Sequence, residues 1–422
     1  MKFTLVILLA IFAVIGTSSV QVQSESQNYY WMKIAAEDKF QRSVIADMGV
    51  AIEIVKDDYV IAYGSDVELA KIKAKGWLLA ASNLEQEMQF AEKAGKLDYP
   101  SADSAFHNYT ELTSELTALA NANPSIVKMT SIGKTPENRD IWALRITTDQ
   151  SHADQKPAVI YMGGHHAREH LSVEMPIMLA QFLVKEYNAQ NPRIVNLINS
   201  RDIHIIPVVN PDGMEYDIQD GKYKMWRKNR AKNNDGTFGV DLNRNYGFQW
   251  GTGGSSSSPS NETYKGTQPF SEKESQAVKN YIEAHDNITI LLSVHSYSKL
   301  ILYPWGHKYA DIEVQRDKDV HEAMANKMAE WNKYTPQQSS ELYIASGDTT
   351  DWSYGVHKII SFTFELDPGG NDFGGGGFYP GASVIQPVFN KNIEPFLYLL
   401  DLSDNPYRAL GGVGIGPISP NP

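Results

Sequence analysis

Short apolar runs that alternate with helical patterns constrain the fold of this chain most. The predicted strands are residues 127–132, 141–147, 158–162, 203–209, 288–294, 300–303 and 359–366. The predicted helices are residues 171–187, 271–285, 320–331 and 385–402. Strands that are apolar on both faces are typical of a parallel sheet covered by helices on each side. Residues 98–404 are therefore predicted to form one α/β domain with a central mixed, largely parallel twisted sheet flanked by helices. We expect Ser271 and Glu274 to form the capping box of the helix that ends at His285.

The first residues have the pattern of an export signal. A positive start at Lys2 is followed by the apolar stretch 5–15 and by small residues up to Ser19. This order is typical of a secretory signal peptide, and the apolar stretch is short for a membrane span. We predict a signal peptide at residues 1–19 and a secreted protein with no membrane association after processing. A retained membrane anchor is the alternative.

Residues 20–97 have the pattern of a separate small α+β unit. Two strands at 50–55 and 58–63 are followed by a helix at 68–75, which Ser65 or Asp66 caps and Gly76 ends. A third apolar run at 77–81 precedes a polar, helical connector. At the other end of the chain, the Gly/Pro-rich residues 405–422 are predicted to be a flexible tail.

The composition excludes some partners and some means of stabilisation. The net charge of −12 is spread along the chain without a long charged run, so nucleic acid is not an expected partner. The sequence contains no cysteine, and no disulfide holds the fold. That does not contradict export, because disulfides matter most in domains too small to build a core.

A group of histidines and a glutamate follows the apolar run 158–162. His166 and Glu169 are three residues apart, and His295 directly follows the distant predicted strand 288–294. Catalytic zinc commonly has three protein ligands of these types and one open position for water. A second interpretation uses the His-x-x-Glu-His pattern, in which His166 and His170 bind the metal of an endopeptidase and Glu169 is the base. The local spacing allows both ligand sets.

Further motifs distinguish between the two interpretations. They are Asn-Pro-Asp-Gly at 210–213, Trp-Arg-Lys-Asn-Arg at 226–230, Asp-Leu-Asn-Arg-Asn at 241–245, His-Ser-Tyr-Ser at 295–298 and Phe-Thr-Phe-Glu at 362–365. In order and spacing, residues 99–402 resemble the zinc metallocarboxypeptidases of the carboxypeptidase A/B type. The endopeptidase interpretation explains none of these downstream motifs.

The resemblance implies a role for each residue of the reaction site. His166, Glu169 and His295 are implied to bind one zinc ion per chain, a ligand set known for carboxypeptidase A. Asp241 is implied to orient His166 from behind the metal. Glu365 is implied to be the general base, and Arg227 the group that stabilises the oxyanion.

The resemblance also implies a site for the substrate. Asn243, Arg244 and Tyr343 would recognise the terminal carboxylate, because a guanidinium forms a bidentate pair with a carboxylate that an internal peptide bond lacks. Arg168 would contact the substrate backbone. The position that sets side-chain specificity corresponds to Thr350. Asp348 lies two residues earlier, and we expect it to admit basic as well as hydrophobic C-terminal residues.

Together these features predict a secreted zinc carboxypeptidase that is made as a zymogen. Residues 20–97 would be its propeptide, removed by an activating protease, and the alternative is a permanent N-terminal domain. We expect a monomer that acts on peptides and proteins with a free C-terminus. A catalytically silent peptide-binding homologue is a further alternative.

Part of the family binds calcium through acidic residues before the zinc-binding strand. Residues 151–157 of this chain contain only one acid, Asp154, which does not favour a calcium site there.

Overall fold

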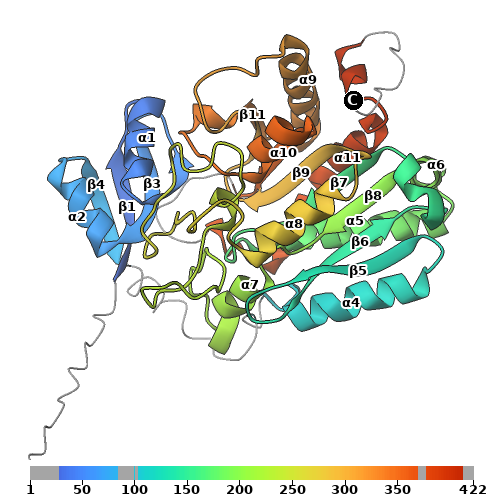
Figure 1. Cartoon of the computed structure of the whole chain (residues 1–422), viewed down its shortest axis with the longest axis horizontal. Coiled ribbons are helices and arrows are strands. Elements are labelled where there is room, and N and C mark those ends of the chain that lie inside the picture. Colours follow the sequence, from blue (N-terminus) through green and yellow to red (C-terminus); the bar gives the residue numbers. More distant parts are fainter. Residues whose placement is uncertain (1–27, 84–98, 100–102, 369–376, 412–422) are drawn as a thin grey trace, which may run out of the picture.

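The computed structural model describes residues 28–83, 99, 103–368 and 377–411. The predicted signal peptide and most of the predicted connector lie outside these residues. Two units are visible side by side in Figure 1, a small one at the N-terminal end of the described chain and a large one formed by the rest. Among the described residues, the structure contains no helix with the length and apolarity to cross a membrane.

The N-terminal unit is a four-stranded sheet with two helices. Its strands have the order β2-β3-β1-β4, and all three pairings are antiparallel. The elements are β1 (Tyr29–Ala35), α1 (Lys39–Asp47), β2 (Ala51–Val55), β3 (Tyr59–Ser65), α2 (Asp66–Ala74) and β4 (Leu78–Asn83). Ser65 and Glu68 form a capping box at the start of α2, and Gly76 follows its end with a φ of +72°. The predicted α+β unit is thus present, with an additional strand (β1) and helix (α1) that the sequence analysis missed.

The large unit contains an eight-stranded mixed sheet. Its order is β11-β10-β12-β9-β7-β8-β6-β5, and the central run from β12 to β8 is parallel. The strands are β5 (Val127–Lys134), β6 (Asp140–Ile146), β7 (Ala158–Met162), β8 (Asp202–Ile206), β9 (Ile288–Ser296), β10 (Leu300–Tyr303), β11 (Thr335–Gln338) and β12 (Ile360–Leu366). This arrangement confirms the predicted α/β fold.

Helices cover both faces of this sheet, as Figure 1 shows. They are α4 (Tyr109–Ala122), α5 (His170–Asn188), α6 (Pro192–Ser200), α7 (Pro211–Ile218), α8 (Lys273–Glu283), α9 (Gln315–Asn332), α10 (Thr349–His357) and α11 (Ile385–Leu402). The central strand β7 is wholly apolar because both of its faces are covered by helices. Val159 and Tyr161 pack into the larger core with α5 and α11, whereas Ile160 and Met162 pack into the smaller core with α8 and α10.

Two local predictions are wrong. Ser271 does not cap α8, because its hydroxyl donates to Glu272 Oε1 (2.7 Å), and Glu274 accepts from Asn229 (3.1 Å) instead of closing a capping box. The predicted flexible tail begins too early. Residues Pro406–Leu410 form a 3₁₀ helix, η8, and the hydroxyl of Tyr407 donates to Asp317 Oδ1 on α9 (2.6 Å). Residues 412–422 lie outside the described part.

Candidate zinc site and substrate cleft

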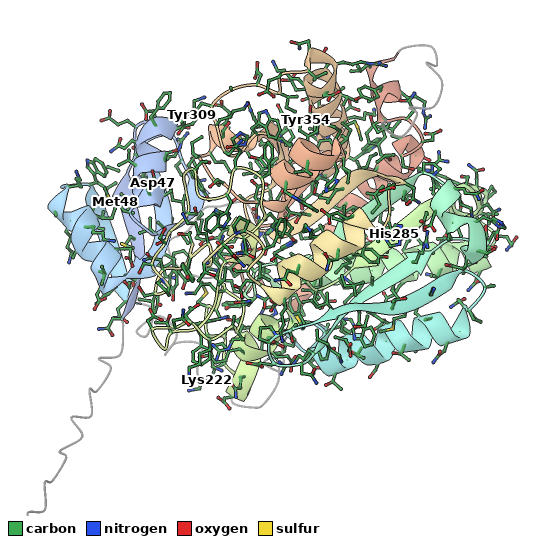
Figure 2. All side chains as sticks on the ribbon, in the orientation of Figure 1. Asp47, Met48, Lys222, His285, Tyr309 and Tyr354 are labelled. Carbon is green, nitrogen blue, oxygen red and sulfur yellow. The ribbon has the colours of Figure 1, made fainter. Side chains whose placement is uncertain are left out.

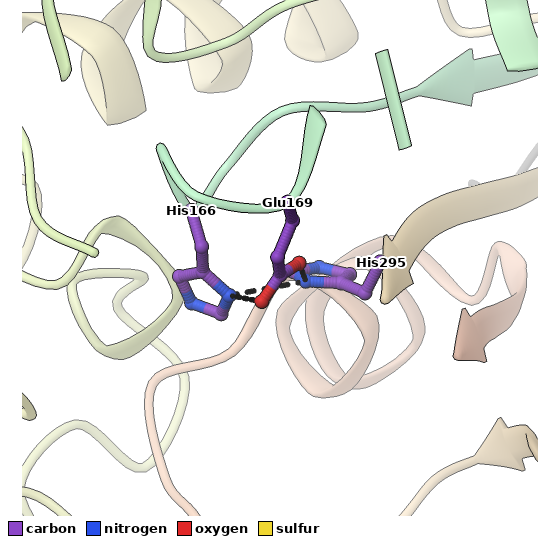
Figure 3. A group of neighbouring side chains, drawn as sticks. All are labelled: His166, Glu169 and His295. Atoms are coloured by element: carbon purple, nitrogen blue, oxygen red, sulfur yellow. Dashed lines mark hydrogen bonds and ion pairs between the residues drawn. The ribbon is translucent and has the colours of Figure 1, made fainter. Parts of the chain in front are cut away.

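Three buried side chains converge beyond the carboxyl end of β7. Figure 3 shows His166 and Glu169 on the turn after β7 and His295 on the neighbouring strand β9. His166 Nδ1 lies 2.6 Å from Glu169 Oε1, and His295 Nδ1 lies 2.9 Å from Glu169 Oε2. One ligand atom from each residue lies within 4.8 Å of the others. Two imidazole nitrogens and a carboxylate oxygen form a donor set that fits zinc.

Glycines allow the turn that carries the first two of these residues. A Cβ on Gly163 would lie 2.1 Å from the carbonyl oxygen of Ser172, so no larger residue fits there. Gly164 has a φ of +61°, a conformation that other residues rarely adopt. The chain therefore reverses tightly at the end of β7 and enters α5. This turn places His166 and Glu169 beyond the carboxyl ends of the parallel strands.

The remaining ring nitrogens of the two histidines have partners that orient them. His166 Nε2 lies 3.2 Å from Asp241 Oδ1, and His295 Nε2 lies 3.1 Å from Ser293 Oγ. Because an acceptor holds each Nε2 proton, Nδ1 of both rings is left to bind a metal. Burial opposes ionisation of Asp241, but Arg227 and His166 hold its pKa well below the usual value. The residues present thus fit a zinc ion.

Glu365 and Arg227 lie next to this group. Glu365 on β12 is the register partner of His295 on the parallel strand β9, so both side chains leave the sheet on the same side. Burial and the carboxylates of Glu169 and Glu53 raise the pKa of Glu365 well above its usual value. Arg227 is held by Asp241 Oδ2, which accepts from its Nε and pairs with its Nη2, each at 3.0 Å.

A cleft of about 400 Å³ brings most of the predicted site residues together. Those that line it are His166, Glu169, Arg227, Asn243, Arg244, Tyr343, Asp348, Thr350 and Glu365. Asp241 and His295 are buried and contact His166 and Glu169, respectively, from behind the cleft wall. Arg168 is also buried, and it pairs with Glu53 and Glu262. Residues from five separate sequence motifs therefore meet at one place.

The residues predicted to recognise a carboxylate are held rigidly. Asn243 and Arg244 lie on the 3₁₀ helix η4 (Leu242–Arg244). Arg244 Nε donates to the carbonyl of Gly254 (3.0 Å) and Nη1 to that of Asn243 (2.8 Å), which fixes the plane of the guanidinium. The Asn243 side-chain oxygen accepts from the backbone N–H of Thr349 (3.0 Å). A fixed guanidinium in a cleft is suited to bind a carboxylate.

Asp348 lines the cleft at the start of α10. Its Oδ1 caps α10 by accepting from Asp351 N (2.9 Å), whereas its buried Oδ2 has no hydrogen-bond partner among the described residues. Burial and the neighbouring Asp351 raise the pKa of Asp348 to about 7. Thr350, the second residue of the same helix, shares a hydrogen bond of 2.8 Å with Thr363 on β12.

His170 does not take part in the metal site. Its Nδ1 lies 2.7 Å from the hydroxyl of Tyr99, and its Nε2 lies 2.8 Å from Asp217 Oδ2. Both nitrogens are therefore engaged away from His166, and the endopeptidase interpretation, which requires His170 as a ligand, is wrong. The sequence analysis missed the roles of Tyr99 and Asp217, because neither lies in a recognisable motif.

Comparisons with known proteins agree with this site. Residues 112–395 match the zinc carboxypeptidase family. A zinc carboxypeptidase of Saccharothrix mutabilis subsp. capreolus is 38% identical over 327 residues, which cover 76% of this chain and 74% of that protein. Carboxypeptidase A2 of Rattus norvegicus is 31% identical over 334 residues, which cover 76% of this chain and 76% of that protein. The crystal structure of carboxypeptidase A from Helicoverpa armigera superposes with a TM-score of 0.74 at 25% identity, over 92% of this chain and 98% of that one.

This chain belongs to the zinc carboxypeptidase family. It is a zinc-dependent metallocarboxypeptidase that acts on peptide substrates, as the sequence analysis predicted. The N-terminal unit lies outside the matched region, which begins in α4.

Proposed function

We propose that this enzyme removes single residues from the free C-terminus of peptides and proteins, with zinc held by His166, Glu169 and His295. The observation that carries this proposal is the common cleft, in which the fixed guanidinium of Arg244 faces the same space as the metal group. A terminal carboxylate bound to Arg244 places the last peptide bond toward the metal group. Asn243 and Tyr343 complete this carboxylate site.

The remaining residues supply proton transfer and charge stabilisation. Zinc, when bound, polarises the substrate carbonyl and lowers the pKa of water. Glu365 accepts the proton of the attacking water and passes it to the leaving amine. Burial raises the pKa of Glu365, which suits a group that must take up a proton, and the charge of a bound metal opposes this rise. Arg227 stabilises the charge that develops on the carbonyl oxygen.

The pocket for the C-terminal side chain accepts hydrophobic and basic residues. Its lining combines Leu300 and Leu302 with Thr350 and Asp348, whose Oδ2 has no hydrogen-bond partner among the described residues. The leucines provide apolar surface for side chains such as those of Leu and Phe. The carboxylate of Asp348, when ionised, pairs with the cation of Lys or Arg.

The N-terminal unit, residues 20–97, is the propeptide of a zymogen. Its strand β2 lies over the cleft, and the carboxylate of Glu53 forms a hydrogen bond with Arg168 and lies 4.0 Å from Arg227. The backbone of β2 is bound as well. Tyr343 donates from its hydroxyl to the carbonyl of Ile52 (3.2 Å), and Ser298 donates to that of Glu53 (3.3 Å). A peptide substrate cannot occupy the cleft at the same time.

Contacts around the cleft hold this unit in place. Asp47 accepts from the backbone N–H of Gly254 (2.8 Å), and the hydroxyl of Tyr309 donates to the carbonyl of Lys39 (2.8 Å). Asp47 and Tyr309 are labelled in Figure 2. An apolar cluster also spans the two units, with Trp31, Ile54, Ile61 and Tyr63 packed on Met225, Tyr297 and Phe378. Cleavage by an activating protease in the connector, at residues 93–98, would release the unit. The connector lies outside the described residues, and the secretion signal at residues 1–19 remains part of this proposal.

The test uses the processed enzyme and blocked dipeptides that end in Phe, Leu or Arg, each as the free acid and as the amide. We expect hydrolysis of the free acids, little or no hydrolysis of the amides, and loss of activity with a zinc chelator. Equal hydrolysis of acid and amide would contradict the exopeptidase assignment. No hydrolysis of any free acid would favour the silent homologue.

A further inference from the structure

A single buried carboxylate outside the cleft, that of Asp217, holds three separate segments. Asp217 is fully buried near the end of α7. Its Oδ2 accepts from His170 Nε2 (2.8 Å) and from the hydroxyl of Tyr379 (2.9 Å), and its Oδ1 accepts from the backbone N–H of Trp226 (2.7 Å). A buried carboxylate needs such donors, and together they fix its position.

Two of these donors are chain neighbours of the reaction site. His170 directly follows Glu169 and is the first residue of α5, and Trp226 directly precedes Arg227. The same carboxylate therefore fixes the backbone next to a metal ligand and the backbone next to the oxyanion-stabilising arginine. Tyr379 adds a further restraint, because its hydroxyl accepts from Met225 N (3.1 Å).

Tyr99 completes the group from the start of the large unit. Because the Asp217 carboxylate accepts, His170 carries its proton on Nε2, and the hydroxyl of Tyr99 donates to Nδ1 (2.7 Å). Burial raises the pKa of Tyr99 well above its usual value, which keeps this hydroxyl protonated. Asp103, four residues on, accepts from Tyr223 (2.8 Å), whose ring stacks on Tyr379 with centroids 3.7 Å apart.

We infer that Asp217 and Tyr99 are positioning residues that align Glu169 and Arg227 through His170 and Trp226. The inference rests on the roles proposed above for Glu169 and Arg227. It also sets a limit on maturation: the activating cleavage must lie before Tyr99, so that the hydroxyl of Tyr99 remains in the mature enzyme.

The test compares Asp217→Asn and Tyr99→Phe with the wild-type mature enzyme. An amide of the same size has one acceptor oxygen in place of two and adds a donor, so it cannot satisfy all three donors of Asp217. We expect Asp217→Asn to lower kcat about tenfold with KM changed less than twofold, and to weaken zinc binding about tenfold in a chelator competition. Tyr99→Phe should change both quantities in the same direction by about threefold.

Asp202→Asn is the matched control. Asp202 is also fully buried and accepts from a histidine, His204 Nε2 (2.9 Å). It is the first residue of β8, however, and lies at the amino ends of the parallel strands, opposite the cleft. This variant should lower the melting temperature without changing kcat or zinc affinity. Equal effects of Asp202→Asn and Asp217→Asn on kcat and zinc affinity would overturn the inference, as would full activity of a mature form that begins after Tyr99.

Two further outcomes remain informative. If Asp217→Asn does not fold, Tyr99→Phe decides alone, because it removes one oxygen atom from a site that keeps its ring packing. If the wild type binds zinc but lacks carboxypeptidase activity, the proposed function fails. The zinc affinities of the variants then still confirm or refute the positioning role.

Discussion

Glu53 provides a direct test of the zymogen proposal. Its side chain is 7% exposed, and its carboxylate is bound to Arg168 and lies 4.0 Å from Arg227, which is also nearly buried. The substitution Glu53→Gln removes the charge and keeps the size of the side chain. The apolar contacts of β2 and its backbone hydrogen bonds to Tyr343 and Ser298 remain.

The size of the effect follows from the contacts that are lost. A hydrogen bond between charged groups contributes about 1.5–3 kcal/mol, which corresponds to roughly a 10- to 150-fold change in an equilibrium constant. Glu262 lies 3.4 Å from Arg168 and continues to compensate its charge after the substitution. We therefore expect the lower part of this range, about a 10- to 30-fold larger fraction of precursor with an open cleft.

The assay is hydrolysis of a small blocked dipeptide by the intact precursor, relative to the same protein after complete activation. Glu37→Gln is the control, because Glu37 is an exposed acid of the same unit outside the cleft. After activation all three proteins should be equally active, since residues 20–97 have been removed. Basal activity of Glu53→Gln equal to that of Glu37→Gln would refute the role of Glu53 in closing the cleft.

Three further predictions concern the cleft. Arg244→Ala should lower kcat/KM for free-acid dipeptides about a hundredfold and leave the slow cleavage of amides unchanged, as measured with matched pairs of substrates. The preference for a C-terminal Arg over Leu, as a ratio of kcat/KM values, should rise about tenfold with pH through about pH 7, because Asp348 is neutral below its pKa of about 7 and anionic above it. Asp348→Asn should abolish this rise, and an unchanged pH profile of the ratio would contradict the assignment. Asp241→Asn should weaken zinc binding about 10- to 100-fold in a chelator competition, and an unchanged affinity would argue against its contact with His166.

The parts of the fold that local patterns determine were predictable from the sequence. The strand β7 and the helix α11 have the predicted bounds. The strand is a wholly apolar run between Pro157 and Gly163, and the helix is a long, largely apolar segment that ends before Ser403. The motif Asn210-Pro211-Asp212-Gly213 consists of residue types that are typical of turns, yet it begins α7. Asn210 accepts from Gly213 N (3.0 Å) as the N-cap, and Pro211 occupies the first turn. The same residue types favour turns and helix starts, so the motif alone does not distinguish them.

The cleft residues lie in motifs, and the sequence predicted which of them would meet. The supporting contacts were not predictable, because they join segments with no shared local pattern. Glu53 and Arg168 are 115 residues apart, and Tyr99 and His170 are 71 apart. Glu53 and Tyr99 are ordinary polar residues in their own segments, and no local pattern marks them as partners of Arg168 and His170. Only the packing of the N-terminal unit on the cleft, and of residue 99 on α5, brings these side chains together.

Metal titration of the mature enzyme tests the central claim most directly. After removal of all metal with a chelator, zinc is added back in known fractions of one equivalent, and cleavage of a free-acid dipeptide is measured at each step. We predict no activity without metal and a linear recovery that ends at one zinc per chain. His295→Ala, which removes one of the three ligands, should show no recovery over the same range. Full activity in the metal-free enzyme, or recovery of His295→Ala equal to that of the wild type, would contradict the account.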